Sequence, residues 1–196
     1  MTLGKISIGL LAGAAATALL GVAPSRAEDG TQFVIRGDAT KNILEQNEIN
    51  IATAEAISKV CIDEATKQGV RVSVAIIDQF GEPVYMYRMD GQNKINIDTA
   101  MMKARTVLNT RQPSKATMNA VLQGRSSELR QYSFGNFANA GGLPIVINGN
   151  QFIGDIGVGG SAPKPPEWSD EICAWRALSK VIGQQPPLLP DVQRSQ

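Results

Sequence analysis

The sequence contains no histidine among its 196 residues. This absence excludes a Ser-His-Asp triad, a Cys-His dyad, a zinc site with histidine ligands and a histidine-ligated heme. Two cysteines are too few for a metal site with four cysteine ligands. The GxxxxGK spacing of a nucleotide phosphate loop is also missing, so the glycines near residue 155 do not predict nucleotide binding.

Excess charge of either sign is missing too. The chain carries 19 lysines and arginines against 18 aspartates and glutamates, and no basic tail or patch follows the first residues. Nucleic acids and anionic membranes attract strongly basic surfaces. The sequence therefore predicts neither a nucleic-acid partner nor a membrane partner.

One long apolar run is present, from Ile6 to Val22. Lys5 precedes it, and the small residues Ser25 and Ala27 follow it at the two positions that a signal peptidase reads. This order predicts a cleaved signal peptide over residues 1–27 and a periplasmic or secreted protein with no membrane segment. A membrane anchor is the alternative, because the run approaches the usual length of about 20 residues.

The remaining sequence fits one domain over residues 47–183, after a polar lead-in (28–46) and before an extended, frayed tail (184–196). Apolar spacing and turn residues predict the order helix, hairpin, two helices, hairpin, helix. The expected elements are a helix capped by Asn47 and ending at Gln68, strands 70–78 and 84–89, helix 95–110, a helix 114–123 capped by Ser114, strands 143–148 and 151–158, and a helix from Ser169 to Gly183. Two hairpins indicate a mostly antiparallel sheet and an α+β fold.

Two strands have unusual composition. Strand 70–78 is apolar or small on both faces, so helices or another subunit should cover both. The last predicted strand and its exit hold Gly154, Gly157, Gly159 and Gly160, which suggests close approach by another backbone or by a ligand.

The two cysteines, Cys61 and Cys173, lie on an early and a late predicted helix. An exported chain reaches an oxidising compartment, where these cysteines form a disulfide if the two helices pack together. Two buried thiols fit the sequence equally well.

Charged residues gather after the second predicted strand. Arg88 and Asp90 end that strand, and Lys103 and Arg105 lie on the following helix. Together they predict a cationic pocket for carboxylates or propionates. The alternative is ordinary ion pairing of Arg88, Asp90 and Lys103 at a surface.

Five of the six methionines fall between the second strand and the short third helix: Met86, Met89, Met101, Met102 and Met118. Thioether sulfur binds soft metals and the axial position of heme iron, and the phenolates of Tyr85, Tyr87 and Tyr132 are a further source of ligands to ferric heme. The alternative is that these methionines fill gaps in the core.

Five motifs, in this order and spacing, resemble the GlcG/HbpS-like heme-binding family over residues 47–182: VAIIDQFGEPVYMYRMDG, MKART, RQPSK, GGLPIVINGNQFIGDIGVGG and DEICAWRAL. The resemblance implies a profilin-like fold, an antiparallel sheet of about five strands flanked by helices. It also implies a homo-oligomer that binds heme or iron outside the cytoplasm, in some members with a redox-sensing partner.

The positions that match the family pattern include Arg88, Met89, Asp90, Lys103, Gly141 and Gly142. With Tyr85 and Met102 they form the predicted ligand-binding set. Many members carry a histidine where this chain has Glu82. Heme here would therefore need Met, Tyr, Lys or Cys as its ligand, or a pocket that holds it without a strong axial bond.

Three functions are compatible with these residues. The first is an exported heme- or tetrapyrrole-binding protein with a heme-sequestering, iron-sequestering or redox-sensing accessory role. The second is a binder of, or enzyme acting on, a small carboxylate such as a glycolate-like acid. The third is an oligomeric structural or signalling partner without turnover. We favour the first, and we favour binding over catalysis.

Overall fold

The computed structural model describes residues 48–148, 151–161 and 168–192. The predicted signal peptide and the lead-in up to residue 46 lie outside this part of the chain, as do Asn47 and the last four residues. Within the described part, no helix is long and apolar enough to cross a membrane.

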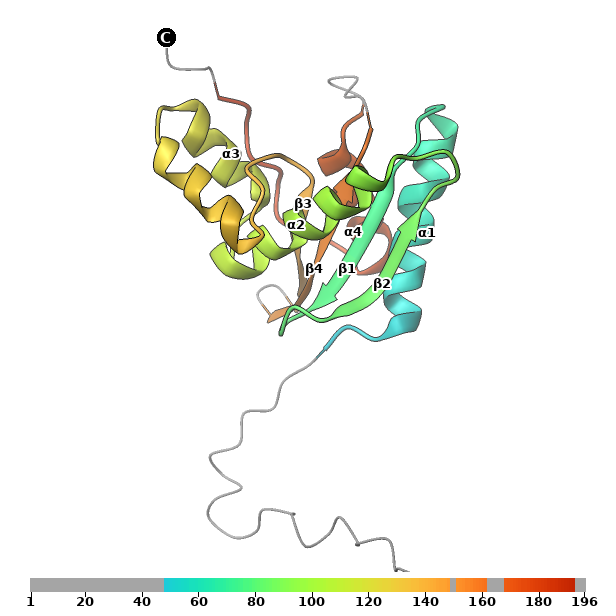
Figure 1. Ribbon diagram of the computed structural model, residues 1–196. Coiled ribbons are helices and arrows are strands. Elements are labelled where there is room, and N and C mark those ends of the chain that lie inside the picture. Colours follow the sequence, from blue (N-terminus) through green and yellow to red (C-terminus); the bar gives the residue numbers. More distant parts are fainter. Residues whose placement is uncertain (1–47, 149–150, 162–167, 193–196) are drawn as a thin grey trace, which may run out of the picture. The chain divides into compact units, whose positions relative to one another are not determined.

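The described chain forms one α+β domain whose elements follow the predicted order (Figure 1). The elements are α1 (Ile51–Lys67), β1 (Ser73–Asp78), β2 (Pro83–Arg88), α2 (Lys94–Thr110), α3 (Ser114–Leu122), the 3₁₀ helix η3 (Ser126–Phe134), β3 (Gly142–Ile147), β4 (Gln151–Gly159) and α4 (Asp170–Val181). The helix η3 falls between the predicted helix 114–123 and the predicted strand 143–148, where the sequence predicted neither a helix nor a strand.

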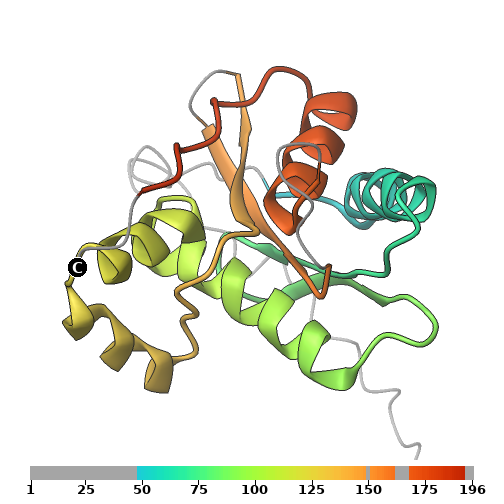
Figure 2. The same ribbon diagram turned by 90° about the horizontal axis from the view of Figure 1, so that it is seen from above.

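The four strands form one antiparallel sheet in the order β2-β1-β4-β3. Each hairpin supplies two neighbouring strands, and β1 pairs with β4 at the centre. Figure 2 shows α1 and α4 on one face of the sheet and α2 on the other. The predicted antiparallel sheet flanked by helices is confirmed, with four strands in the described residues where about five were expected.

Of the three predicted N-caps, the one at α4 is confirmed and those at α1 and α3 are wrong. Ser169 caps α4, its hydroxyl accepting from the backbone N–H of Ile172. The cap of α1 is Asn50 rather than Asn47, since the Asn50 side chain accepts from Thr53 N–H. Ser114 does not cap α3, whose N-cap is Pro113.

The two faces of β1 are both covered by helices of the same chain. Val74 and Ile76 lie in the larger apolar cluster under α1 and α4. Ala75 and Ile77 lie in the smaller cluster under α2. The apolar composition of β1 therefore needs no second subunit to explain it.

The glycines of the last hairpin allow α2 to approach the sheet closely. A methyl group at Gly157 would overlap the carbonyl oxygen of Ala100, and one at Gly159 would lie 2.6 Å from the carbonyl oxygen of Asn96. These contacts confirm the expectation of close backbone approach, and the approaching element is a helix of this chain.

A buried carboxyl accompanies this tight packing. Asp155 lies on β4 opposite Ile77, and its side chain is fully buried. Neither of its carboxyl oxygens has a hydrogen-bond partner among the described residues. Burial raises the pKa of Asp155 to about 8, against a smaller lowering effect of Arg111.

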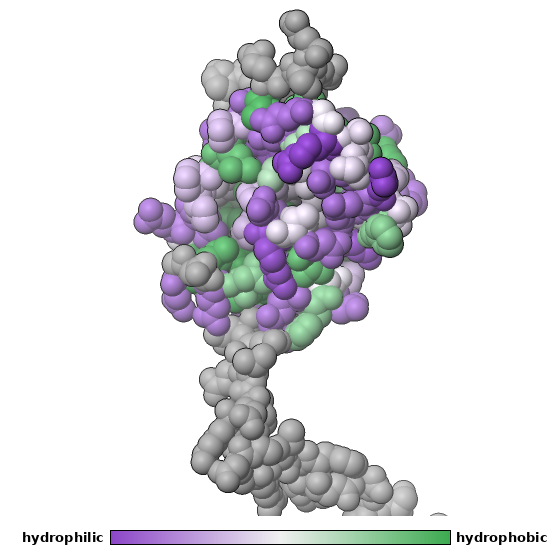
Figure 3. Space-filling model, turned by 90° about the vertical axis from the view of Figure 1, so that its left-hand side faces the viewer, coloured by the Kyte–Doolittle hydropathy of each residue, from purple (hydrophilic) through white to green (hydrophobic). Residues whose placement is uncertain are grey.

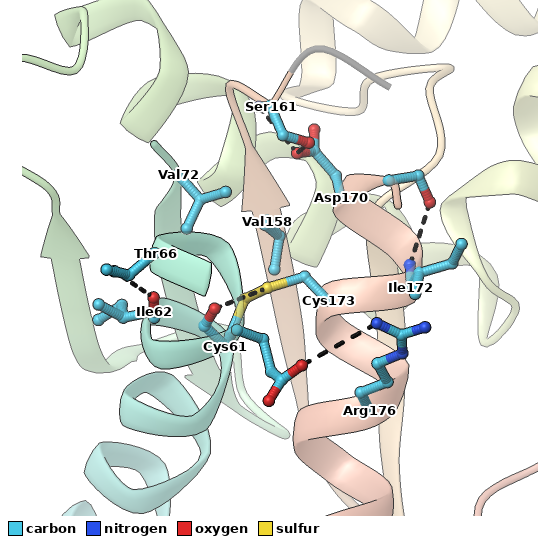
Figure 4. Close-up of a disulfide and its surroundings, with 12 residues drawn as sticks. Cys61, Ile62, Thr66, Val72, Val158, Ser161, Asp170, Ile172, Cys173 and Arg176 are labelled. Carbon is cyan, nitrogen blue, oxygen red and sulfur yellow. Dashed lines mark hydrogen bonds and ion pairs between the residues drawn. A yellow bond between two sulfur atoms is a disulfide. The ribbon is translucent and has the colours of Figure 1, made fainter. Parts of the chain in front are cut away.

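Cys61 of α1 and Cys173 of α4 are joined by a disulfide (Figure 4). Their Cα atoms lie 5.1 Å apart, and both residues are fully buried in the apolar cluster under the sheet. The bond links an early helix to the last one across most of the domain's sequence.

Helices α3 and η3 lie together beside the sheet. Figure 3 shows this face of the molecule, on which hydrophilic side chains are interrupted by hydrophobic patches. The exposed large apolar residues of η3 are Leu129, Tyr132 and Phe134.

Candidate functional site

The structure divides the predicted ligand-binding residues between two places. Tyr85 and Arg88 lie on the edge strand β2, and Met89 and Asp90 follow it directly. Lys103 and Met102 lie on α2, while Gly141 and Gly142 precede or begin β3 at the other side of the sheet. Since α2 packs mainly over β4 and β1, its lysine lies away from β2.

Arg88 and Lys103 therefore do not form the predicted cationic pocket. The Arg88 guanidinium donates to the carbonyl oxygen of Gln92. The Lys103 ammonium donates instead to Val158 of β4 and to Asp170 of α4, away from β2. The predicted surface pairing of Lys103 with Asp90 is also wrong, because Lys103 is buried and pairs with Asp170. Arg105 is exposed and lies against Gly135.

The methionines are dispersed as well. Met101 belongs to the buried cluster under α2, whereas Met86 is 44% exposed on β2. Met89 lies against the larger cluster, where its sulfur accepts from Val72 N–H at 3.3 Å. Met102 is half-buried on α2, and Met118 borders a cavity described below. These sulfur atoms do not gather as a soft-metal cluster.

A buried ion pair joins α2 to the start of α4. The Lys103 ammonium donates to the Asp170 carboxylate and to the carbonyl oxygen of Val158, both at 2.8 Å. Only 3% of the Lys103 side chain is exposed. The other Asp170 oxygen accepts from the backbone N–H of Ser161 at 3.0 Å and from its hydroxyl (Figure 4). Both Asp170 carboxylate oxygens and two of the three N–H donors of Lys103 thus have partners.

The double glycine of the fourth motif lies beside this pair. A methyl group at Gly141 would lie 3.0 Å from the Lys103 ammonium nitrogen and 2.9 Å from Cβ of Asp170, so only glycine fits there. The Ser114 hydroxyl accepts from Gly142 N–H at 2.8 Å and donates to the Asn139 carbonyl oxygen at 2.6 Å. Ser114 therefore fixes the loop that leads into β3.

A second pair joins α3 to α4. The Lys115 ammonium lies 3.3 Å from the Glu171 carboxylate and 2.7 Å from the Asp191 carboxylate of the C-terminal tail. Burial raises the pKa of Glu171, although Lys115 opposes the shift. Burial alone would lower the pKa of Lys115, but Asp191 and Glu171 together raise it.

These charges border a cavity of about 430 Å³ between α3 and α4, here named the α3–α4 cavity. Its walls come from five parts of the chain: Lys115 and Met118 of α3, Asn139 and Ala140 before β3, Ser161 after β4, residues 168–172 at the start of α4, and Leu188 and Asp191 of the tail. Two buried polar atoms of wall residues, Glu171 Oε1 and Trp168 Nε1, have no hydrogen-bond partner among the described residues. Buried polar groups of this kind are costly unless a partner satisfies them.

The tail is extended as predicted, but it is packed rather than frayed up to residue 191. Trp175 Nε1 donates to the Pro186 carbonyl oxygen at 2.9 Å, and Asn119 Nδ2 donates to the Pro190 carbonyl oxygen at 3.1 Å. Gln185 Nε2 donates to the Val146 carbonyl oxygen at 3.2 Å. The tail therefore completes the walls of the α3–α4 cavity.

A larger opening of about 490 Å³ lies near the other predicted residues, between Met89, Gln92 and Gly160. Its central amide is satisfied, since Gln92 Nε2 donates to the carbonyl oxygens of Arg71 and Gly160. Its wall residues contribute no buried polar atom without a partner among the described residues. Of the two cavities, the α3–α4 cavity is the stronger candidate.

Sequence reasoning placed Lys103, Gly141 and Gly142 near a site but missed Lys115, Trp168 and Asp191. A signal for Lys115 was present, because it lies in the RQPSK motif and the DEICAWRAL motif places two acidic residues in the first turn of α4. Lys103 of α2 and Lys115 of α3 could have been matched with the acidic pair that begins α4, which gives one ion pair for each lysine. No local pattern indicates Asp191.

Comparison with known proteins identifies the fold and the family. A family model described as "Haem degrading protein HbpS-like" matches residues 49–179. Protein GlcG of Escherichia coli K12 is 33% identical over 119 residues, covering 61% of this chain and 83% of GlcG. The crystal structure of HbpS superposes with a TM-score of 0.63 at 26% identity, covering 77% of this chain and 99% of HbpS.

A heme complex of PduOC shares the fold, with a TM-score of 0.57 at 20% identity over 67% of this chain and 94% of the other. The HbpS match spans all five motifs on which the sequence resemblance was based. The chain therefore belongs to the HbpS-like family.

Proposed function

We propose that this chain is an exported protein that binds heme in the α3–α4 cavity. The observation that carries the proposal is the HbpS-like match over residues 49–179, which includes α3, α4 and the loop before β3. The heme complex of PduOC, which has the same fold, supports it. When bound, heme would supply a redox-active iron.

The residues around the cavity fit such a group. Its volume of about 430 Å³ lies in the range of ligand pockets, about 300–1,000 Å³. Ile172 and Leu188 would provide apolar wall, Lys115 would provide a cation for a propionate, and Met118 would provide a thioether ligand for the iron. Cys61 and Cys173 are excluded as ligands because they form a disulfide.

The unsatisfied polar atoms of the cavity support a bound ligand. Glu171 Oε1 and Trp168 Nε1 belong to wall residues and have no partner among the described residues. The indole N–H of Trp168 donates and the carboxylate oxygen Glu171 Oε1 accepts, so a ligand that reached both atoms would need an acceptor and a donor. The chain's own part is to bind and orient the ligand and to exclude water.

The test is a titration of the purified protein with hemin, followed by absorption. We expect a saturable Soret shift, and replacement of Met118 by Leu should weaken binding and move the band. Met86→Leu is the matched control, because Met86 lies on the exposed edge strand β2. A spectrum identical to that of an unrelated protein would remove the heme proposal, and equal spectra for both variants would remove Met118 as ligand.

Export is part of the proposal and has its own test. Protein recovered from the periplasm or the medium should begin at Glu28, as measured by intact mass. A full-length chain in the cytoplasm would contradict export. A homo-oligomer, expected from the family resemblance, should elute from a sizing column well ahead of the mass of one chain.

A small-carboxylate binder is the second candidate function. It is favoured by Lys115, whose second partner Asp191 is a carboxylate on an exposed side chain. A glycolate-like acid that stabilises the protein against heat, without any Soret shift from hemin, would favour this candidate over heme.

A further inference from the structure

We propose that residues 185–191 form a strap and that its Asp191 occupies the place on Lys115 that a ligand's carboxylate takes. The inference rests on the α3–α4 cavity as the ligand site of the proposed function. It adds the chemistry of the incoming group, a carboxylate on an otherwise apolar body, and a competitor within the chain itself.

The two partners of Lys115 differ in burial. Glu171 has a side chain that is only 4% exposed, so it is a permanent partner inside the fold. Asp191 is 86% exposed and yet lies closer to the ammonium nitrogen, at 2.7 Å against 3.3 Å. An exposed carboxylate can leave without uncovering apolar surface, whereas loss of Glu171 would leave a buried charge unpaired.

The strap is held by a few contacts to carbonyl oxygens of the main chain. Trp175, Asn119 and Gln185 provide three side-chain hydrogen bonds to or from the strap, at 2.9 to 3.2 Å. Leu188 lines the α3–α4 cavity and also a neighbouring apolar cavity of about 350 Å³ beneath Pro186 and Pro187. The strap thus covers both cavities with a small number of interactions.

The strap lies beyond the part of the chain that the family match covers. That match ends at residue 179, near the end of α4, whereas the strap begins at Gln185. Lys115 and Glu171 lie inside the matched region. The ammonium group and its buried partner therefore lie within the matched region, whereas the exchangeable carboxylate lies C-terminal to it.

Exchange of one carboxylate for another leaves the charge around Lys115 unchanged. When a ligand's carboxylate replaces Asp191, Lys115 keeps two anionic partners and Asp191 moves into water, where it is well solvated. Binding then costs the free energy of detaching part of the strap from the domain. Ligands that lack a carboxylate gain nothing from Lys115, because they cannot replace the contact that they break.

The same chemistry fits a heme propionate and a small organic acid, so the experiment uses probes for both. Hemin, hemin dimethyl ester and succinate are titrated into the wild type and Asp191→Asn, by absorption for the two hemins and by calorimetry for succinate. The matched control is Asp98→Asn, which removes one charge from an exposed ion pair on α2 and lies at the opposite end of that helix from α3.

We expect Asp191→Asn to bind hemin roughly two- to fivefold more tightly than the wild type, which is the effect of removing one exposed ion pair. Hemin dimethyl ester should bind both proteins more weakly than hemin does, because it cannot pair with Lys115. Asp98→Asn should match the wild type with every probe. Hydrogen exchange in residues 185–191 should accelerate when hemin binds the wild type.

The outcomes separate this inference from the heme proposal. Hemin binding that ignores both Asp191→Asn and esterification overturns the strap competition and leaves heme binding intact. Succinate binding that tightens in Asp191→Asn, with no hemin binding, supports the competition and overturns heme as the ligand. Failure of every probe with both proteins overturns both.

Discussion

On the face of the sheet covered by α1 and α4, large apolar side chains such as Ile57, Ile156 and Leu178 fill the space between the layers. On the face covered by α2, the apolar cluster is smaller and three of its five buried residues are alanines, and the helix backbone lies against glycines of β4. The face under α1 and α4 is stabilised by large buried apolar side chains and a disulfide. The face under α2 is stabilised by close contact between the helix backbone and the strand backbone.

The difference decides how each face responds to change. A core of large side chains has neighbours that relax when a methylene is lost, so small deletions cost moderately. Backbone against backbone cannot relax in that way, so even one added methyl must move a helix or a strand. The ion pair at the edge of the candidate site joins the two faces, since Lys103 comes from α2 and Asp170, which lines the α3–α4 cavity, comes from α4.

The largest effect should come from adding one methyl to the α2 face, in Gly157→Ala. Its Cβ would overlap the carbonyl oxygen of Ala100, so we expect a loss of at least about 4 kcal/mol in unfolding free energy, or no folded protein. Gly69→Ala is the matched control, because nothing lies within 4 Å of that position. Its positive φ alone should cost about 1–2 kcal/mol in a urea melt. Equal costs would contradict the contrast between the faces.

The next largest effect concerns the disulfide of the opposite face. Replacing Cys61 and Cys173 together by Ala should lower the free energy of unfolding by about 3 kcal/mol, because the reduced denatured chain regains the freedom of a long loop. Denaturant melts with and without reductant measure it. The double variant should lose all sensitivity to reductant, and a wild type equally insensitive would show that the bond contributes little.

An intermediate effect, visible as a pH dependence, should come from Asp155 on the α2 face. Its pKa is raised from 3.8 to about 8 in the folded protein, which therefore holds a proton that the unfolded chain has released between those values. This contribution to stability is complete below about pH 4 and is lost as the pH rises through 8, by up to about 1.4 kcal/mol per pH unit. Asp155→Asn should remove that slope in melts between pH 5 and 8. An unchanged slope would place its origin elsewhere.

The smallest effect should follow from removing one methyl on the face covered by α1 and α4. Ile57 is fully buried, and Ile57→Val should cost only about 1 kcal/mol. Thermal melts of Ile57→Val and Gly157→Ala, measured together, compare the loss of one methyl on this face with the gain of one methyl on the other. A cost approaching that of Gly157→Ala would mean that both faces are equally rigid.

The order of elements and the antiparallel hairpins could be predicted from sequence because they depend on local periodicity and turn residues. The cap of α1 was misplaced by three residues, since Asn47 and Asn50 both fit the pattern and only the hydrogen bond to Thr53 selects the second. Ser114 also has the right type for a cap, but the folded chain uses its hydroxyl to hold the Asn139–Gly142 loop.

The candidate site was only partly predictable, because its partners are far apart in the sequence. Arg88 and Lys103 are close along the chain, yet α2 carries Lys103 across the sheet to Asp170. The contact of Lys115 with Asp191 depends on where an extended tail lies on the folded domain. Local patterns carry no information on such contacts, which explains why the disulfide also remained open.

The strand order has a consequence for how the chain is made. In the central pair, Ser73 lies opposite Gly159, so the first hairpin waits for its neighbour until most of the domain has been synthesised. Until then, the nascent chain exposes the unpaired edge of β1, with apolar residues on both sides. Non-local pairing of this kind slows folding. Pairing of β1 with β4 is therefore the step that we expect to limit the folding rate.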